Sequence, residues 1–147
     1  MKNEVTDYNI DDLDRDKQTT WDGVRNYQAR NFMRDDMCVG DLAFFYHSNA
    51  DPSGVAGVMK IIKTKITDPT QFEKKGKYYD EKATKAVPRW FCVEVQFVKN
   101  LKNFVGLPEI KQNKKLKGIL VAQKGTRLSV QPVSKEHFKE IIRMSSV

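Results

Sequence analysis

Thr20-Trp21-Asp22-Gly23-Val24-Arg25-Asn26-Tyr27-Gln28-Ala29-Arg30-Asn31-Phe32 is the stretch around which the rest of the chain is organised. Its Asp22-Gly23 pair predicts a tight turn, because glycine adopts positive φ without steric cost. A helix is expected to follow, from about Val24 to Arg34. The sequence therefore predicts a turn that places an aromatic side chain, Trp21, beside the start of a helix.

The expected helix has a polar side and an apolar side. Residues four apart share one stripe of an α-helix, which groups Asn26, Arg30 and Arg34. The opposite side, expected to face a core, carries Val24, Tyr27 and Phe32. A basic stripe with an amide, next to a tryptophan, suits an anionic and planar partner. The simpler interpretation is that Trp21 is buried and the arginines are solvated, since large aromatic side chains are mostly core residues.

Outside this stretch, expected strands outnumber expected helices. Extended segments are expected at 42–48, at 55–67 with a bend near Gly57, at 89–99 and at 128–132, with 18–20 as a linker. Helical turns or helices are expected at 10–14 after the cap Asn9, after Asp68-Pro69, at 107–113 and after Ser134. No βαβ rhythm links the strands. This pattern favours a mixed or antiparallel barrel with helices packed at its ends.

Composition and charge fit a single globular domain. The chain has 147 residues, of which 39% are hydrophobic and 10% aromatic, enough to bury a real core. The formal net charge of +7 is compatible with a polyanionic partner, because each neutralised phosphate releases counterions. No apolar run is long enough for a transmembrane helix and no apolar leader follows the amino terminus, so we expect neither a membrane partner nor secretion.

The two cysteines, Cys38 and Cys92, have neither metal-ligand spacing nor the pattern of a disulfide framework. We expect reduced thiols, no metal and no cofactor. A cytoplasmic location is expected, or a nuclear one if the source is eukaryotic.

Nothing in the sequence favours an enzyme. His47 and Ser48 are neighbours on an expected strand, so their side chains point to opposite faces and do not form a nucleophile–base pair. The other histidine, His137, lies in the terminal helix. No motif of a hydrolase, a phosphate-binding loop or a dinucleotide site is present. We expect no catalytic activity, and a small hydrolase that uses His47 ranks last among the alternatives.

Five segments, in order, resemble the EVE domain family and together extend over nearly the whole chain. They are Trp21–Phe32, Val39–Asp41, Phe44–Asn49, Pro88–Trp90 and Arg127–Val133. EVE domains share the PUA-like fold and are related to YTH readers of methylated adenine. The resemblance implies an α+β, PUA-like mixed β-barrel with short helices packed around its ends. It also implies a non-catalytic module that binds DNA or RNA. Such a module accommodates a modified base, a 5-substituted cytosine or a methylated adenine, in an aromatic pocket.

The amino terminus departs from the family pattern. EVE domains usually open with a strand of the type aromatic-Trp-Leu followed by Lys-Ser-Glu-Pro. Here Met1–Val5 align with only the end of that motif, with Asn3 for Ser and Val5 for Pro. We therefore expect a single EVE domain over residues 1–147 that lacks part of the usual first strand. An open barrel edge of this kind carries a risk of weak self-association.

A protein that reads a base must take it out of the stack, cover its faces and bond to its edge. The expected walls of such a pocket are Trp21, Tyr46, Tyr79 and Trp90. The expected edge readers are Asn26, Ser48 and Asn3, since amides and hydroxyls both donate and accept. Flanking phosphates are expected on Arg25, Arg30 and Arg89, because a guanidinium fork matches an oxyanion.

Packing is an alternative for several of these residues. A core position on a Phe-rich strand explains Tyr46 about as well as a pocket role does. Trp90 is at the start of a strand, where a tryptophan is more often a core residue than part of a pocket. His47 is expected to form a hydrogen bond with the backbone. The functional alternative is a binding protein for structured RNA, such as transfer or ribosomal RNA, without a modified-base preference. A methyl group that fills an apolar cage contributes only about 0.8 kcal/mol. We therefore expect modest selectivity, with phosphate contacts supplying much of the affinity.

Overall fold

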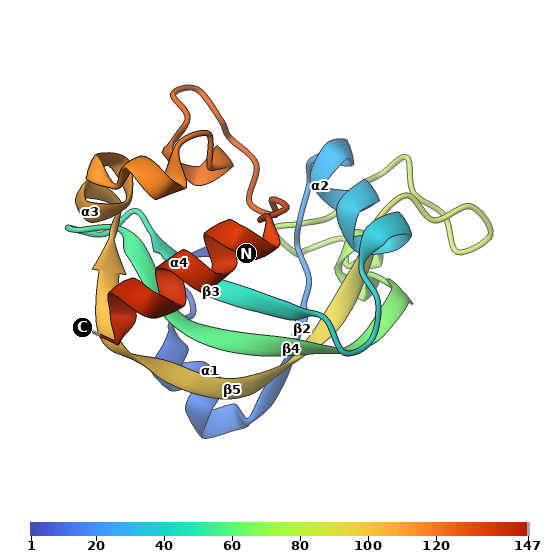
Figure 1. Ribbon diagram of the computed structural model, residues 1–147. Helices are drawn as coiled ribbons and strands as arrows, with labels where there is room; N and C mark the ends of the chain where they lie inside the picture. Colours follow the sequence, from blue (N-terminus) through green and yellow to red (C-terminus); the bar gives the residue numbers. More distant parts are fainter. Residues whose placement is uncertain (147) are drawn as a thin grey trace.

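The computed structural model describes residues 1–146 and contains one five-stranded mixed sheet with short helices around it (Figure 1). The strands are β1 Lys2–Glu4, β2 Gln18–Trp21, β3 Leu42–Ser48, β4 Gly54–Thr67 and β5 Phe91–Gly106. The α-helices are α1 Ile10–Asp16, α2 Tyr27–Asn31, α3 Leu107–Gln112 and α4 Lys135–Ser145. A π-helical turn, η1 Phe32–Asp36, and three 3-10 turns, η2 Pro69–Phe72, η3 Lys114–Leu116 and η4 Leu120–Ala122, complete the set. The expected α+β class is confirmed.

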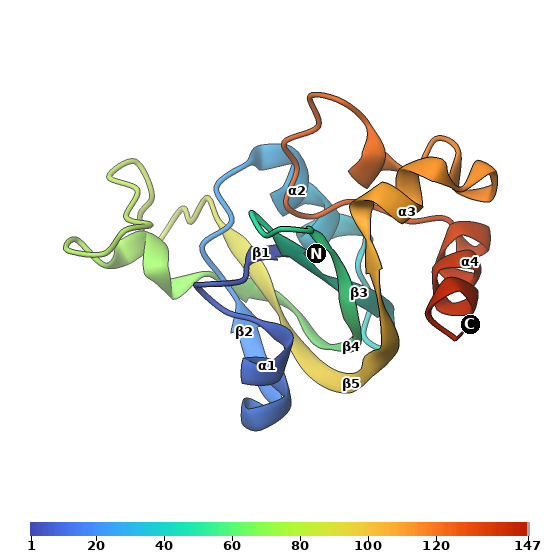
Figure 2. The same ribbon diagram turned by 90° about the vertical axis from the view of Figure 1, so that its left-hand side faces the viewer.

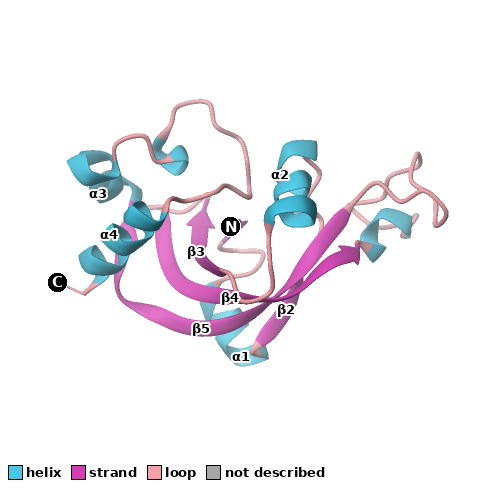
Figure 3. Cartoon of the chain, turned by 45° about the vertical axis from the view of Figure 1, so that its right-hand side comes forward, coloured by secondary structure: helices cyan, strands magenta, loops and turns pink. Residues whose placement is uncertain are grey.

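The sheet has the strand order β1-β3-β4-β5-β2. β1 is parallel to β3, and the other neighbours are antiparallel. The two long strands, β4 and β5, bend together so that the sheet curls on itself (Figures 2 and 3). Within residues 1–146, β1 pairs with β3 alone and β2 with β5 alone. The barrel is therefore open along a seam between β1 and β2, and weak self-association through an open edge stays a prediction.

The bend in β4 falls at Gly57, as the sequence predicted. The pairing register with β5 shifts between Val55 and Gly57. A Cβ atom on Gly57 would lie 2.5 Å from Ile10 Cδ1 and 2.8 Å from the Lys99 carbonyl oxygen. Only glycine allows helix α1 to pack this close to the strand.

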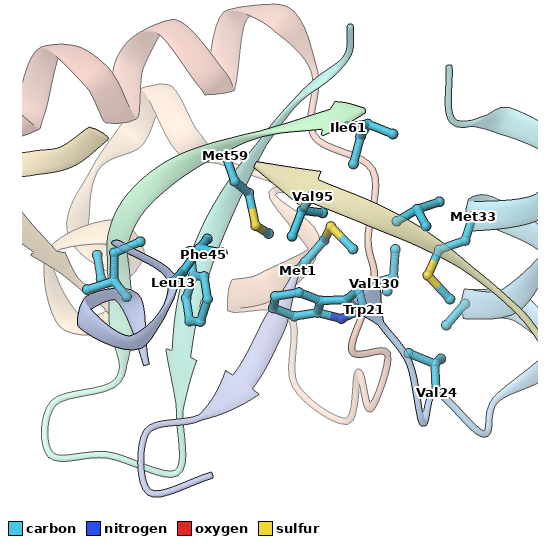
Figure 4. Packing of buried hydrophobic residues seen from close by; sticks show 14 residues of the cluster. Met1, Leu13, Trp21, Val24, Met33, Phe45, Met59, Ile61, Val95 and Val130 are labelled. Carbon is cyan, nitrogen blue, oxygen red and sulfur yellow. The ribbon is translucent and has the colours of Figure 1, made fainter. Parts of the chain in front are cut away.

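The buried residues form two clusters. One fills the inside of the curled sheet, where Trp21 packs with Met1 and Val130 (Figure 4). The other lies under α3 and α4, where the Phe44 ring stacks on Phe138 at a centroid distance of 4.1 Å. Tyr46 belongs to this second cluster, and burial raises the pKa of its hydroxyl. The structure therefore supports the packing interpretation of Tyr46.

The central helix begins later and is wider than expected. Asn26 caps it, because its side-chain oxygen accepts a hydrogen bond from the Ala29 N–H at 3.0 Å, and α2 then continues into the π-turn η1. Ala29 and Met33 are fully buried, whereas Tyr27, which was expected to face the core, is 49% exposed. The Tyr27 ring stacks on Trp90, which is distant in the sequence, and helical periodicity does not reveal such a contact.

Four extended segments differ from expectation because their partners are distant in sequence. Residues 18–20, expected to be a linker, form most of β2, with Thr19 opposite Val95. β5 continues to Gly106, well beyond residue 99, because β4 also pairs with its polar second half. The segment 128–132 is no sheet strand, but the Ser129 carbonyl accepts a hydrogen bond from the Lys2 N–H at 2.7 Å. Residues 2–4, not expected to form a complete strand, are β1.

Helix α1 carries the expected cap and an unexpected one. Asn9 and Asp12 exchange side-chain to backbone hydrogen bonds in a capping box. In addition, Nε2 of His47 accepts a hydrogen bond from the Ile10 N–H at 3.1 Å. Burial lowers the pKa of His47 below its usual 6.5. His47 is thus a neutral structural acceptor, as the packing interpretation required. No helix in residues 1–146 has the length and hydrophobicity to cross a membrane.

Protonation of His47 should destabilise the protein, because the imidazolium no longer accepts the Ile10 N–H. The folded pKa is lowered, so between that value and 6.5 the unfolded chain binds more protons and stability falls as the pH falls. We expect the urea midpoint to decline from about pH 7 to about pH 5. The decline should be smaller in His47→Gln, which keeps an acceptor but does not titrate. Equal pH profiles of the two proteins would contradict this role.

Candidate functional site

A cavity of about 570 Å³ lies along the open seam. β1 contributes Lys2, Asn3 and Glu4, and β2 with the following turn contributes Thr19, Thr20, Trp21, Asp22 and Gly23. The cavity occupies the place where direct pairing of β1 with β2 would have closed the barrel. Its volume is in the range of about 300–1,000 Å³ that is typical of small-ligand sites. Edge strands present backbone N–H and C=O groups, which makes the free edge of β2 a wall with hydrogen-bonding groups. On β1 the Lys2 and Glu4 N–H groups already donate to the Ser129 carbonyl and the Asn3 side chain.

Four of the residues expected at the site line this cavity: Asn3, Trp21, Arg25 and Ser48. Trp21 is only 6% exposed and contacts Phe45 edge-on, with ring centroids 5.4 Å apart. It therefore belongs to the core and to the cavity floor at once. Ser48 ends β3 opposite Glu4 of β1 and brings a hydroxyl to the cavity lining.

The aromatic side wall is Tyr78, which the sequence analysis did not select; it selected the adjacent Tyr79. Tyr78 and Lys77 line the cavity, and Nζ of Lys77 lies 5.4 Å from the Tyr78 ring centroid. Gly23 has φ +77°, and a Cβ atom there would lie 2.7 Å from the Tyr78 ring. Glycine is thus required both for the turn and for the close approach of the ring. Tyr79 is 39% exposed and is not among the cavity-lining residues.

Arg25 is bound inside the protein. Its guanidinium donates to the carboxylate of Asp68, the hydroxyl of Thr70 and the carbonyl oxygens of Tyr78 and Val24, at 2.8–3.1 Å. These contacts use all five N–H groups that an arginine has. No donor remains for a phosphate, so the expected phosphate role does not fit Arg25. Arg25 instead anchors the backbone that carries the Tyr78 ring.

Asp68 is the partner that makes this anchor strong. Its carboxylate is 1% exposed and also accepts hydrogen bonds from the Gly23 N–H and from Thr70. Burial alone would raise the pKa of Asp68, but the hydrogen bonds from Thr70, Gly23 and Arg25 outweigh burial and lower it. A charged carboxylate therefore joins the β2 turn, the η2 turn and the loop that bears Tyr78.

The other expected residues lie away from the cavity. Asn26 caps α2 and Tyr46 is in the second core cluster, as described above. The Trp90 ring stacks on Tyr27, and its indole N–H donates to Asp80 at 2.7 Å. Arg30 and Arg89 lie beside this stack: Arg30 donates to the Arg89 carbonyl at 2.8 Å. Trp21 and Trp90 thus do not share one concavity, contrary to expectation.

Exposed cations at the cavity rim were not predicted. They are Lys77 on one side and Arg127 on the other, with Lys2 half-buried between the strands. The acids at the same rim are Glu4, Asp7 and Asp22, and burial together with Asp68 and Glu73 raises the pKa of Asp22. The three cations and the three acids therefore balance at this rim, and Arg25 is already paired with Asp68. Arg127 lay within a segment that resembles the family, which was the available signal for it.

A second cavity, of about 440 Å³, has a different character. It is lined mainly by apolar residues, among them Phe32, Phe44 and Phe138, and by Asp36 and Asp41 but by no lysine or arginine. An anionic polymer would find no cation there. The described residues also contain no cluster of histidine, cysteine and carboxylate side chains suited to a metal ion. The seam cavity is therefore the better candidate for a site.

The protein is thus an α+β domain whose unclosed barrel has a polar cavity along the open seam. The chain belongs to the EVE domain family, whose model matches residues 1–144. Human thymocyte nuclear protein 1 is 44% identical over 93% of this chain, and the Danio rerio protein of the same name is 45% identical over 86%. The chain spans 64% and 57% of the length of these relatives, less than two thirds.

Solved structures agree with this membership. A Pseudomonas syringae protein is 44% identical and superposes with a TM-score of 0.94 over 99% of this chain and 97% of that one. The human THYN1 protein, solved in complex with DNA containing 5-methylcytosine, is 42% identical, with a TM-score of 0.88 over 95% of this chain and 86% of that one.

Loss of the Arg25 side chain should loosen the cavity wall. We expect Arg25→Met to lower the free energy of unfolding by about 2–3 kcal/mol, because the buried Asp68 carboxylate loses its counter-ion. Arg34→Met is the matched control, since Arg34 pairs with the exposed neighbour Asp35 and should change stability by less than about 0.5 kcal/mol. Urea unfolding measures both. Equal effects of the two substitutions would show that the Arg25–Asp68 pair has no special role.

Proposed function

We propose that this chain is a DNA-binding module that takes one modified base, 5-methylcytosine in the first instance, into the seam cavity. The observation that carries the proposal is the cavity itself: an aromatic floor and wall, polar edges and exposed cations on both rims. The human THYN1 protein, which was solved with 5-methylcytosine DNA, supports the choice of ligand because it is 42% identical over 95% of this chain.

Each part of the cavity has a role in this proposal. Trp21 and Tyr78 would contact the faces of the base, a type of contact that contributes about 1–3 kcal/mol per base. Asn3, Ser48 and the backbone edge of β2 would bond to its polar edge. A methyl group held against the aromatic surface would add about 0.8 kcal/mol. Lys77 and Arg127 would hold the flanking phosphates in place of Arg25.

The base must leave the duplex to reach the cavity, which costs a few kcal/mol of lost stacking and pairing. Phosphate contacts have to offset much of this cost, so affinity should depend steeply on salt. The module would bind the base without catalysing a reaction. His47, the residue of the hydrolase alternative, is already used as the acceptor of the Ile10 N–H of α1. We propose a nuclear location if the source is eukaryotic, because the relatives are named as nuclear proteins. In a bacterium the location would be the cytoplasm, where the DNA is.

Fluorescence anisotropy with matched oligonucleotides tests the proposal. Duplexes with 5-methylcytosine, hydroxymethylcytosine, methyladenine or plain bases, and RNA of the same sequence, are titrated at two salt concentrations. We expect tighter binding to one modified DNA than to its plain counterpart, by about three- to ten-fold. Equal affinity for every oligonucleotide would instead favour a general binder, including one for structured RNA. Absence of salt-sensitive binding would contradict both.

Two substitutions separate phosphate binding from base recognition. Arg127→Ala should weaken binding to all oligonucleotides alike and reduce the salt slope by about one, because one phosphate contact is lost. Lys139→Ala is its control, with the same change of charge on the exposed side of α4. Ser48→Phe should fill part of the cavity and remove the preference for the modified base while the salt slope stays unchanged. If Ser48→Phe retains full preference in a folded protein, the base is read elsewhere.

A further inference from the structure

Tyr27 is a large aromatic side chain held flat at the surface. Its ring is 49% exposed and stacks on Trp90, with centroids 4.7 Å apart and planes 17° from parallel. One face of Tyr27 is therefore covered by Trp90, and the other faces outward. The cavity described above does not include Tyr27, and no step of the proposed base recognition uses it.

The support under Tyr27 is rigid. Trp90 is 6% exposed, its indole N–H donates to Asp80 at 2.7 Å, and the Arg25 guanidinium lies 5.1 Å from its ring centroid. Gln71, fully buried, accepts hydrogen bonds from the backbone N–H groups of Arg89 and Trp90. A tyrosine held by such a rigid support loses little further conformational freedom when it stacks on a ligand.

Two arginines contact the Tyr27 side chain. Nη1 of Arg89 donates to the Tyr27 hydroxyl at 3.3 Å. The Arg30 guanidinium lies over the Tyr27 ring, 4.6 Å from its centroid, and 5.9 Å from the centroid of Trp90. A guanidinium centred on the face opposite Trp90 would lie farther from Trp90 than this, so the centre of that outer face is not occupied by Arg30. The acids near these arginines are Asp80, 4.0 Å from Arg89, and Asp35, which interacts electrostatically with Arg30. An aromatic face with cations at its border is a platform for a base and its phosphate.

A continuous column connects this platform to the cavity. Tyr78 of the cavity wall is 5.6 Å from the Arg25 guanidinium, which is 5.1 Å from Trp90, which is 4.7 Å from Tyr27. Stacked nucleotides rise about 3.4 Å each along a strand, and unstacked ones span more. A strand that leaves the cavity along this column would reach Tyr27 after about two to four nucleotides.

We propose that the outer face of Tyr27 binds a second, unpaired nucleobase of the same strand, with Arg89 and Arg30 beside its phosphate. This inference rests on the proposed function, because the cavity defines where the strand starts. A base is the occupant that the column favours, since both ends of the column are aromatic and the arginines at its outer end attract a polyanion. The strand would then be unstacked at two places, and DNA already single-stranded or frayed there would bind best.

Abasic scanning of the oligonucleotide tests this proposal. Single-stranded DNA with one 5-methylcytosine is prepared with an abasic site at each position two to four nucleotides away on either side. We expect one abasic position to weaken binding of the wild-type protein by about five-fold or more, the loss of one base–aromatic stack. Tyr27→Ala should bind the intact strand as weakly as the wild type binds that abasic strand, and should lose nothing further on the abasic strand.

Three further variants serve as controls for this experiment. Tyr27→Phe keeps the aromatic face and should restore the sensitivity to the abasic site. Tyr27→Leu covers Trp90 without an aromatic ring, so it should behave as Tyr27→Ala even if the alanine variant is less stable. Phe104→Ala removes an aromatic side chain of similar exposure, 43%, at the distal end of β5, and should bind as the wild type does.

The outcomes for the two proposals are distinguishable. If the wild type prefers 5-methylcytosine but no flanking position is sensitive, or if Tyr27→Leu binds as tightly as Tyr27→Phe, the second site is disproved and base recognition stands. If a flanking position is sensitive through Tyr27 while modified and plain cytosine bind equally, the second site stands and the modified-base preference fails.

Discussion

The ion pair between Arg25 and Asp68 is the interaction on which the functional surface depends. Asp68 is almost completely buried, and it holds the N–H of Gly23 and the Arg25 guanidinium. Arg25 in turn binds the Tyr78 carbonyl and lies 5.1 Å from Trp90. A buried pair of this kind adds little net stability compared with apolar side chains, but it fixes one arrangement because any other leaves a buried charge unpaired. Both the cavity wall and the surface platform follow from it.

The open seam leaves a cavity in the wall of the barrel. β4 and β5 curl the sheet until its two end strands face each other, and the residues between β1 and β2 then line a cavity instead of a sheet. Trp21 stabilises the core from the inside and would meet a ligand from the same position. Trp90, in contrast, contributes nothing to the cavity but supports Tyr27. Trp21 thus lines the cavity and Trp90 supports the exposed Tyr27 ring, and Arg25 lies between these two surfaces.

Local signals in the sequence predicted local structure well. The caps Asn9, Asp68 and Ser134 each accept the expected backbone hydrogen bond, because a cap depends on residues only two or three positions away. The family resemblance supplied the fold class. What failed depends on distant partners: β2 exists because β5 lies beside it, and Arg25 is saturated by groups up to 53 residues away. The same tertiary contacts decide that Tyr27 is exposed and that Tyr78, and not Tyr79, lines the cavity.

In the proposed function the nucleobase enters the seam between β1 and β2. Amide hydrogen exchange followed by NMR, with and without a 5-methylcytosine oligonucleotide, tests it most directly. We predict slower exchange at residues 2–4, at 18–24 and at Lys77 and Tyr78 when DNA is bound, because a base there shields both strand edges from water. Unchanged exchange along the seam, with protection instead around Phe44 and Phe138 of the second cavity, would contradict the account.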